Sequence, residues 1–252
     1  MKTVWITGSS TGIGFATAEK FLNKNWKVVI SSSNYEKLSL AKKKLLEKTS
    51  NTELYTYECN ISNRAIVKNT IDKIVKEIGS IDLAILNAAA YSPNKEQKFS
   101  IENYEHLIDV NLKGTLYCLE FLIEKMRYSN NHIAIVSSPV GYRGLPTAGA
   151  YGLTKAGLIN LSESLFFDLK KYKIKVSMIN PGFIKTDSTK LNSFPMPFIK
   201  SSEYAADKIF SGLTGSYKFE ILFPTFFLLI MKTLRILPYK VYFYLITKFT
   251  KL

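Results

Sequence analysis

The stretch Thr3-Val4-Trp5-Ile6-Thr7-Gly8-Ser9-Ser10-Thr11-Gly12-Ile13-Gly14 decides the fold of this 252-residue chain. Its first part, Val4–Ile6, is a short apolar run of the kind that forms a buried strand, and Gly8 ends the run. A stretch with helical period opens at Gly12. The sequence therefore predicts a strand, a glycine-rich turn and a helix in direct succession.

Each glycine of this turn has its own predicted role. Gly8 allows the tight turn, Gly12 lets the backbone approach a pyrophosphate, and Gly14 lets the helix pack close to the sheet. The start of the helix offers unpaired N–H groups and the positive end of the helix dipole to phosphates. The alternative is a glycine-rich turn that binds no ligand.

Short apolar runs of the same kind alternate with helical stretches along the chain. The predicted strands are Val4–Ile6, Val28–Ile30, Leu54–Tyr57, Leu83–Leu86, Ile133–Val136 and Val176–Ile179. Such alternation predicts an α/β fold, a doubly wound parallel sheet with helices on both faces.

One helix shows the pattern in detail. It is predicted to begin with Ser62 as its N-cap and to stop at Gly79. The residues predicted to share its apolar face are Ile66, Ile71, Ile74, Val75 and Ile78.

Composition excludes several classes of protein. Hydrophobic residues make up 46% of the chain, which is ordinary for a packed core and rules out a disordered chain. Cys59 and Cys118 form no metal-type pair, and the only histidines are His106 and His132, so we expect neither a disulfide scaffold nor a metal site. The first residues lack the long apolar region of an export signal, so we expect a cytoplasmic protein.

The net charge of +14 invites a nucleic-acid interpretation, which the composition disfavours. Arginine, the preferred residue for bidentate phosphate and base contacts, occurs only at Arg64, Arg127, Arg143 and Arg235. The lysines are scattered over candidate helices rather than clustered in one block. We therefore interpret most of the charge as a lysine-rich background and expect no nucleic-acid partner.

A second constellation lies in Tyr151-Gly152-Leu153-Thr154-Lys155. Tyr151 and Lys155 are four residues apart and share one helix face. A lysine ammonium beside a phenol favours the phenolate and lowers the pKa of the tyrosine. Ser138 follows the strand Ile133–Val136, where its hydroxyl can polarise a substrate carbonyl. A Tyr–Lys pair alone is usually a surface contact, but together with the glycine turn it favours an active site.

These motifs resemble the short-chain dehydrogenase/reductase family over about residues 2–223. The resemblance implies a single doubly wound, Rossmann-type domain with a seven-stranded parallel sheet. It also implies hydride transfer between a nicotinamide cofactor and a carbonyl/alcohol pair. The motifs that carry the resemblance are the turn Thr7–Gly14, Asn87-Ala88-Ala89, Asn111, Ser138 with Tyr151 and Lys155, and Asn180-Pro181-Gly182 with Thr186.

The resemblance implies a role for each of four catalytic residues. Tyr151 would be the general acid/base for the substrate oxygen, and Ser138 would hydrogen-bond the same oxygen. Lys155 would hold the nicotinamide ribose hydroxyls and lower the pKa of Tyr151. Asn111 would hold a water that links Lys155 to solvent.

The same resemblance implies a set of cofactor-binding residues. Pro181 and Gly182 would pass the backbone under the nicotinamide, and Thr186 would reach its carboxamide or the diphosphate. The full set is Gly8, Ser10, Thr11, Gly12, Ile13, Gly14, Ser33, Asn34, Asn60, Ile61, Asn87, Ala88, Ala89, Tyr151, Lys155, Pro181, Gly182, Ile184 and Thr186.

Two of these residues depart from the family pattern. Asn60 stands where the family usually has an aspartate near the adenine ring, and its amide can both accept and donate a hydrogen bond. Ala89 replaces the usual glycine of the Asn-Ala-Gly motif, which is a small steric change.

A third departure bears on the choice of cofactor. NAD enzymes usually hold the ribose 2′-OH with a carboxylate at the end of the second strand. Here that stretch reads Ser31-Ser32-Ser33-Asn34, and no acid precedes Glu36. The arginine that NADP-preferring relatives often carry near Ser33 is missing too, but Ser32, Ser33, Asn34 and Lys37 offer donors to a 2′-phosphate. We therefore predict NADP over NAD.

The segment between Thr186 and Ser201 would form a lid over the substrate, by the same resemblance. Its apolar residues are Phe194, Met196, Phe198 and Ile199, and Tyr142 and Arg143 are further candidates for lining the site. An apolar lid suits an apolar substrate, such as a lipid, retinoid, steroid-like or acyl carbonyl. The alternative is that the lid packs on the core.

The C-terminal residues 224–252 extend the domain of residues 1–223. Apolar runs in this extension are too short to span a bilayer. It has no acidic residue, and its basic residues are Lys232, Arg235, Lys240, Lys248 and Lys251. This pattern favours peripheral binding to an anionic inner membrane surface, the alternative being helices that cover the core or an oligomer contact.

Three functions follow in order of preference. The first is an NADP-dependent carbonyl reductase or alcohol dehydrogenase, and the second is a non-catalytic dinucleotide-binding regulatory or scaffold protein. A nucleic-acid binder is third. Relatives are commonly dimers or tetramers built from the helix of Tyr151 and the last strand. Because the extension can obstruct the last-strand contact, we expect a dimer.

Overall fold

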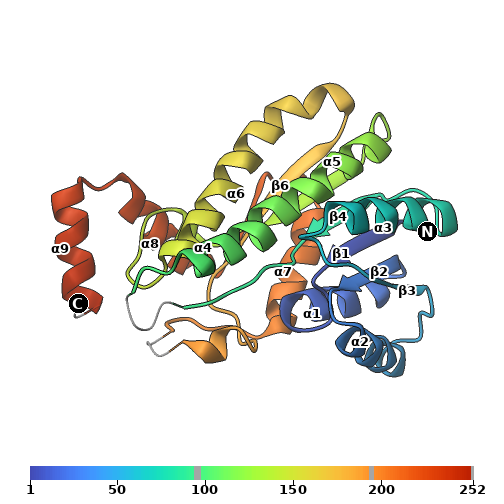
Figure 1. Cartoon of the computed structure of the whole chain (residues 1–252), viewed down its shortest axis with the longest axis horizontal. Coiled ribbons are helices and arrows are strands. Elements are labelled where there is room, and N and C mark those ends of the chain that lie inside the picture. The colour runs from blue at the N-terminus through green and yellow to red at the C-terminus, as the bar shows by residue number, and fades with distance from the viewer. Residues whose placement is uncertain (94–97, 193–195, 251–252) are drawn as a thin grey trace.

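Seven parallel strands form one sheet at the centre of the molecule (Figure 1). The structure is a computed structural model that describes residues 1–93, 98–192 and 196–250. The strands are β1 Thr3–Thr7, β2 Lys27–Ser32, β3 Leu54–Glu58, β4 Leu83–Leu86, β5 His132–Val136, β6 Lys175–Pro181 and β7 Glu220–Phe223. Their order across the sheet is β3-β2-β1-β4-β5-β6-β7. The predicted doubly wound α/β fold is confirmed.

Helices cover both faces of this sheet. On one face α1 packs against α7, and on the other α3 packs against α5. The main helices are α1 Gly12–Leu22, α2 Tyr35–Lys48, α3 Arg64–Glu77, α4 Ile101–Leu107, α5 Gly114–Met126, α6 Gly149–Asp168, α7 Ser202–Thr214, α8 Thr225–Ile236 and α9 Tyr239–Thr250. The shorter ones are the π-helix η1 Ile108–Lys113 and the 3₁₀ turns η2 Pro139–Gly141, η3 Lys170–Tyr172 and η4 Thr189–Leu191.

Side-chain alternation along β1 divides the core into two parts. Val4 and Ile6 point to the face of α1 and α7, where they join Phe21 and Ile209. Trp5 points to the opposite face and joins the cluster under α3, α5 and α6. All five residues of β1 are buried, as expected of a central parallel strand covered on both sides.

The predicted start of α3 is wrong by one residue. Asn63 is the N-cap, and its Oδ1 accepts the N–H of Ile66 at 3.1 Å, whereas the Ser62 hydroxyl donates to Asn60. Val67 and Ile71 lie on the buried face, and Ile66 is exposed. The reason is the period of the helix: Val67 lies four residues before Ile71 and so shares its face, while Ile66 is rotated away.

The C-terminal extension folds into α8 and α9. Leu228 and Met231 of α8 are buried in a small cluster with Tyr142 and Met178. Lys232 of α8 forms an ion pair with Glu220, the first residue of β7. One face of α8 therefore packs on the domain, in keeping with the core-covering alternative for this helix.

Arg143 holds the junction between α8 and α9. Its guanidinium donates to the carbonyl oxygens of Leu234 at 2.7 Å, Leu237 at 2.6 Å and Arg235 at 3.2 Å. It also lies 4.0 Å from the centre of the Tyr242 ring. Arg143 thus satisfies carbonyls that the end of α8 leaves unpaired.

Tyr142 and Arg143, expected to line the substrate site, contact the C-terminal extension. Both also line a pocket of about 340 Å³ with Gly141, Gly149 and Gly152, so their place at the substrate site stays a prediction. The Tyr142 hydroxyl donates to Glu220 at 2.6 Å, and Arg143 is engaged with the end of α8. Both side chains hold the C-terminal extension, because the loop after η2 turns toward α8.

We predict that the substitution Arg143→Leu loosens α9 without unfolding the domain. Charge-assisted hydrogen bonds contribute about 1.5 kcal/mol or more each, so backbone amides of residues 239–250 should exchange about tenfold faster or more. Hydrogen exchange read by mass spectrometry measures this. Arg127→Leu is the matched control, because Arg127 stacks on Tyr172, away from α9. Equal exchange of residues 239–250 in both variants would contradict the role of Arg143.

Candidate active site

The glycine turn after β1 is clamped to the end of β4. The amide Nδ2 of Asn87 donates to the carbonyl oxygens of Thr7 and Gly8, both at 3.0 Å. The Thr7 hydroxyl accepts the backbone N–H groups of Asn87 and Ala88, also at 3.0 Å. These bonds join β1 and β4 where the strand order reverses, which is the ligand-binding position of doubly wound sheets.

The backbone of this turn needs glycine at the predicted positions. Gly8 has φ +63°, and an added Cβ would lie 2.6 Å from the Cα of Ala88. A Cβ on Gly14 would lie 2.6 Å from the carbonyl oxygen of Gly8. Ala89 is exposed, so its methyl group crowds neither glycine.

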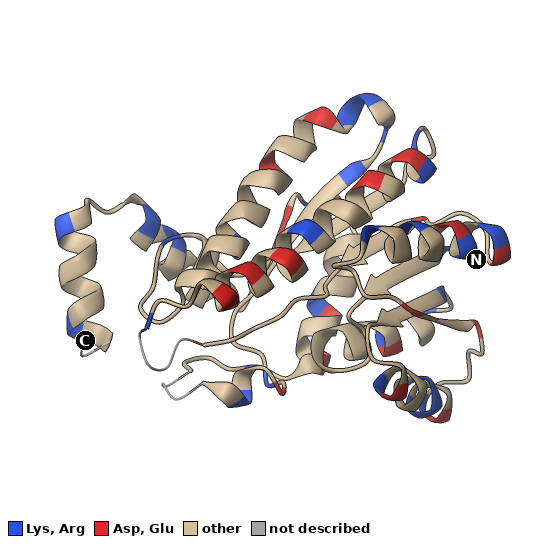
Figure 2. Ribbon diagram, viewed as in Figure 1, with Lys and Arg blue, Asp and Glu red and all other residues tan. Residues whose placement is uncertain are grey.

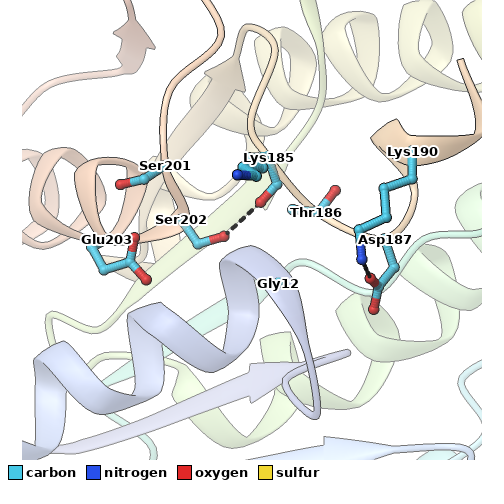
Figure 3. A pocket seen from close by; sticks show the side chains of 8 residues that line it. All are labelled: Gly12, Lys185, Thr186, Asp187, Lys190, Ser201, Ser202 and Glu203. Atoms are coloured by element: carbon cyan, nitrogen blue, oxygen red, sulfur yellow. Dashed lines mark hydrogen bonds and ion pairs between the residues drawn. The ribbon is translucent and has the colours of Figure 1, made fainter.

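The first turn of α1 is open to an anion. Thr11 is its N-cap residue and makes no side-chain hydrogen bond to the helix, whereas side chains cap α2, α3, α4 and α7. A pocket of about 340 Å³ opens beside this turn (Figure 3). Its lining residues are Gly12, Lys185, Thr186, Asp187, Lys190, Ser201, Ser202 and Glu203. In the close-up, Thr186 and Lys185 come from the loop after β6, opposite Gly12.

Serine and asparagine side chains gather at the end of β2. The Ser10 hydroxyl donates to Ser32 Oγ at 3.1 Å, and Asn34 caps α2 by accepting the N–H of Lys37 at 2.7 Å. Ser33, Asn34 and Lys37 are exposed. The structure thus brings together the four residues that the sequence predicts for a 2′-phosphate.

The Asn60 side chain has fewer free hydrogen-bonding positions than the sequence predicts. Its Oδ1 accepts both the backbone N–H of Ser62 at 3.1 Å and the Ser62 hydroxyl at 2.7 Å, so its acceptor positions are occupied. Its amide Nδ2 makes no hydrogen bond within the described residues. Ile61, beside it, is buried and fills the space at Gly114, where an added Cβ would lie 2.7 Å from Ile61 Cδ1.

Tyr151, Lys155 and Ser138 meet at the ends of β5 and α6. The Lys155 Nζ donates to the carbonyl oxygen of Val136 at 2.9 Å and lies 5.4 Å from the centre of the Tyr151 ring. The Ser137 hydroxyl donates to the carbonyl oxygen of Lys155 at 2.9 Å and fastens α6 to the strand end. Ser138 lies close enough to the Tyr151 side chain to lower its pKa. The predicted constellation is therefore assembled.

Burial sets the protonation of this pair. It lowers the pKa of Lys155 to about 7, because the ammonium has left water. Burial also raises the pKa of Tyr151, and the nearby Tyr91 raises it further, while Ser138 lowers it in part. The lowering of the Tyr151 pKa that we expected from Lys155 is not found in the protein alone. A lysine with a pKa of about 7 is about half charged at neutral pH, so its positive field is weaker than that of a fully charged ammonium.

Asn111 lies in the π-helix η1, a rare element that often marks functional sites. It is buried, and its side chain accepts the N–H of Ala90 at 2.8 Å and donates to the carbonyl oxygen of Ala90 at 3.1 Å. It also donates to the Thr154 hydroxyl at 3.1 Å. The side chain of Asn111 thus fixes the chain after β4 against the helix that carries Tyr151.

Tyr91 is a site residue that the sequence analysis missed. Its ring packs edge-on against Tyr151, with centroids 4.9 Å apart, and its hydroxyl donates to Asn192. Gly141 was missed as well: an added Cβ would lie 2.6 Å from the backbone carbon of Lys155. Neither residue belongs to a spacing motif, so only the fold reveals them.

The loop after β6 returns to the sheet before α7. Lys185 N–H donates to the carbonyl oxygen of Lys200 at 2.8 Å, and Lys200 N–H donates to that of Phe183 at 2.9 Å. Gly182 lies tight against α8, where an added Cβ would lie 3.2 Å from the Phe227 ring. Ile184 is buried, and the Thr186 N–H donates to the Thr189 hydroxyl at 2.9 Å.

The lid expected over residues 187–200 lies partly outside the described residues, which include neither Phe194 nor Pro195. Its described part reaches the site through the Tyr91–Asn192 hydrogen bond. Phe198 and Ile199 are exposed, and the Phe198 ring lies 5.9 Å from that of Phe226 in α8.

Comparison with known families identifies this arrangement. A family model described as short chain dehydrogenase matches residues 2–194. The chain belongs to the short-chain dehydrogenase family. A 3-oxoacyl-[acyl-carrier-protein] reductase of Rickettsia typhi is 35% identical to this short-chain dehydrogenase over 218 residues, which cover 85% of this chain and 83% of the relative. An uncharacterized oxidoreductase of Staphylococcus epidermidis is 27% identical over 214 residues, which cover 84% and 91% of the two chains.

Solved structures share the fold of this short-chain dehydrogenase. A short chain dehydrogenase/reductase of Burkholderia phymatum, in complex with NAD, superposes with a TM-score of 0.83 at 21% identity and covers 92% of each chain. A short-chain type dehydrogenase/reductase of Mycobacterium ulcerans gives a TM-score of 0.79 at 22% identity and covers 88% of this chain and 87% of the other. Family membership makes the chain an oxidoreductase of the NAD(P)-dependent kind.

We predict that Lys155 gives the ligand-free protein a pH-dependent stability. Its pKa falls from 10.5 to about 7 on folding. Between these values the unfolded chain binds more protons, so the free energy of unfolding rises with pH, by up to about 1.4 kcal/mol per pH unit. Urea unfolding from pH 7 to pH 8.5 should show this rise for the parent and for Lys42→Met, an exposed control, but not for Lys155→Met. An equal rise in all three proteins would contradict the assignment.

Proposed function

We propose that the protein is an NADP(H)-dependent reductase of apolar carbonyl compounds, with Tyr151 as the proton donor. The observation that carries the proposal is the meeting of Ser138, Tyr151 and Lys155 beside the open glycine turn. Membership of an oxidoreductase family sets the reaction class.

The residues present fit a nicotinamide dinucleotide. The N-terminal turn of α1 lacks a side-chain cap, and Gly12 has φ +58°, so its backbone N–H groups and positive dipole end can take the diphosphate. Gly12 and Thr186 face the same pocket. Asn87, Ala88 and Ala89 border the turn, and Lys155 and Tyr151 would hold the nicotinamide ribose. The bound cofactor would supply the hydride.

Three residues of this chain would neutralise or stabilise the negative charge that develops on the substrate oxygen. As the carbonyl carbon takes the hydride, Tyr151 gives its proton to the oxygen and the C=O bond becomes a C–OH group. Ser138 donates a hydrogen bond to the same oxygen, which stabilises the developing negative charge. Lys155, with a pKa of about 7, can lose or gain a proton at neutral pH and stabilises the tyrosinate as an ammonium.

The protonation state of Tyr151 in the ligand-free protein suits the proton donor that carbonyl reduction needs. Burial raises the pKa of Tyr151, so the phenol carries its proton at neutral pH in the ligand-free protein. A proton donor is what carbonyl reduction needs, whereas alcohol oxidation needs the tyrosinate. Asn111 and Tyr91 would act as positioning residues, since they fix the chain beside Tyr151 and touch no reacting atom.

The substrate class rests on the apolar surface next to this site. Phe198 and Ile199 are exposed on the loop after β6, and Leu191 is exposed on the same loop. A long apolar chain attached to the carbonyl would cover such side chains. The relatives of Rickettsia are named for 3-oxoacyl substrates, which combine a ketone with an acyl chain. Thioesters with short and long 3-oxoacyl chains are therefore the first compounds to test.

A non-catalytic dinucleotide-binding protein is the second candidate. It is favoured only by the pKa values, which in the protein alone leave Tyr151 neutral and Lys155 partly uncharged. Binding of NADPH without turnover of any carbonyl in a broad panel would select this function. Turnover that depends on Tyr151 would exclude it.

We predict that turnover depends on the hydroxyl group of Tyr151. Tyr151→Phe removes the proton donor and should lower kcat for NADPH oxidation by about 10²–10⁴-fold. NADPH affinity, measured by fluorescence titration, should stay close to that of the parent. Tyr128→Phe is the control, because Tyr128 is an exposed tyrosine after α5. Parent-like turnover in Tyr151→Phe would rule out the assigned role.

We predict that residues at the end of β2 set the preference for NADP. Ser33→Asp places a carboxylate where a 2′-phosphate would lie and should lower the ratio of NADPH to NADH affinity by about tenfold or more. Lys37→Ala should lower the ratio in the same direction, and Lys42→Ala, on the same helix, should leave it unchanged. Dissociation constants from titration of each cofactor decide the matter. Tenfold tighter binding of NADH than of NADPH by the parent would overturn the preference for NADP.

A further inference from the structure

The helix α8 is apolar on two opposite faces. Its inner face buries Leu228 and Met231 against the domain. Its outer face carries Phe226, Leu229, Ile230 and Ile236, which are 66%, 53%, 43% and 81% exposed. The spacing of three, four and ten residues from Phe226 places these side chains on one side of the helix. Thr233 is the one polar residue on this side of α8, whereas a helix that only covered a core would carry mainly polar residues there.

The helix α9 follows α8 and lies farther from the sheet (Figure 1). Tyr242 is its one buried residue among those described. Tyr239, Phe243, Tyr244 and Phe249 are exposed. The Tyr242 hydroxyl donates to the carbonyl oxygen of Gly144, and this bond, with the contacts of Arg143, fixes the direction of α9. These contacts therefore hold α9 in place while its aromatic side chains stay exposed.

Charge on the two helices has a single sign. Figure 2 shows blue segments and no red on α8 and α9, and the sequence has no acidic residue after Glu220. Lys232 is neutralised by Glu220. Lys240 and Lys248 are exposed and form no ion pair with the residues that the structure describes. Positive charges thus flank the exposed aromatic and aliphatic side chains.

The residues exposed on α8 and α9 fit an anionic lipid surface better than a second copy of the chain. A second copy of the chain would bring the same positive charges to the contact, and lysine is depleted in protein interfaces. An anionic lipid surface attracts lysines and also accepts aromatic and aliphatic side chains at the depth of the headgroups. Each helix has 12 residues, about 18 Å, which suits a helix lying along the surface. No helix in the described parts of the chain is long and apolar enough to cross a membrane.

We infer that α8 and α9 form a membrane-docking surface, defined by Phe226, Leu229, Ile230, Ile236, Tyr239, Phe243, Tyr244 and Phe249 with Lys240 and Lys248. This surface lies in the interfacial region of a bilayer that contains anionic lipids. The inference does not depend on the proposed function, because it rests on the extension alone.

The docking surface begins at the edge of the candidate active site. The Phe198 ring lies 5.9 Å from Phe226 and 6.1 Å from Phe227, and the Phe183 ring lies 5.6 Å from Phe227. Docking would therefore bring the loop after β6 to the lipid surface. If the proposed function holds, an apolar substrate dissolved in the bilayer reaches the site without crossing water.

The test is co-sedimentation of the full-length protein with lipid vesicles. Vesicles of phosphatidylcholine alone are compared with vesicles that also contain phosphatidylglycerol, at low and high salt. We expect binding to the anionic vesicles that weakens as salt is raised. Lys240→Gln combined with Lys248→Gln should lower the partition coefficient about thirtyfold. Lys42→Gln with Lys43→Gln, two exposed lysines of α2, is the matched control and should bind like the parent.

A second variant tests the apolar part. Ile236→Gln with Phe249→Gln removes two strongly exposed side chains and should lower binding to both kinds of vesicle by about tenfold or more. Tyr128→Gln with Phe167→Gln, which changes two exposed aromatic residues outside the extension, should have no effect. Circular dichroism and NADPH binding confirm that each variant is folded.

Any of three outcomes would overturn the inference, the first two of which concern vesicle binding. One is parent protein that binds neither kind of vesicle, and the second is extension variants that bind as well as the parent. The third is a vesicle-independent dimer, seen by analytical ultracentrifugation, that the variants convert to monomer. NADPH oxidation with a water-soluble carbonyl distinguishes the two proposals, because variants that lose vesicle binding should keep this activity.

Discussion

Asn87 makes the contact on which the site depends. The sheet reverses its strand order between β1 and β4, and at this point Asn87 donates to Thr7 and Gly8 across the gap. Gly8 can accept this bond only because it adopts φ +63° and lies against Ala88 without a Cβ. The turn so held aims the start of α1 at the carboxyl ends of the strands. Each later feature of the site, from the α1 N-terminus to the loop after β6, is placed relative to this clamp.

The buried Lys155 is a second constraint. Unlike the contact of Asn87, its burial lowers the stability of the folded protein. Lys155 is 2% exposed and forms no ion pair with a carboxylate among the described residues, so its ammonium is destabilised and its pKa falls. The fold tolerates this because Val136 offers a carbonyl oxygen and Ser137 holds the helix backbone. A destabilised group at the centre of an otherwise consistent structure is typical of a functional site. The same burial keeps the proton on Tyr151, so one physical cause sets both residues.

The sequence predicted what depends on local pattern and failed where contacts are remote. The apolar runs around Trp5 and Ile85 become central strands because every neighbour in a parallel sheet buries them. Local pattern also places Tyr151 and Lys155 on one face. The choice of Asn63 over Ser62 as a cap was missed, because both residue types cap helices equally well and only the register of the buried face decides. Tyr91 was missed, and the contacts of Arg143 with α8 were not predicted, since the partners of both residues lie about a hundred residues away.

In the C-terminal extension, α8 has one apolar face packed on the domain and another exposed to solvent. Gly182 lacks a side chain, which lets Phe227 approach the loop after β6, and α8 then has to present its other face outward. Exposed apolar surface of this extent is unfavourable in water and is retained in folded proteins mainly where something covers it. Arg143 and the ion pair of Lys232 hold α8 and α9 in place with polar contacts on the inner side, so the outer apolar row is not needed for folding. On the inference of membrane docking, this outer row contacts lipid while the inner side is held by Leu228, Met231 and the polar contacts, and the row adjoins the loop after β6 through Phe226 and Phe198.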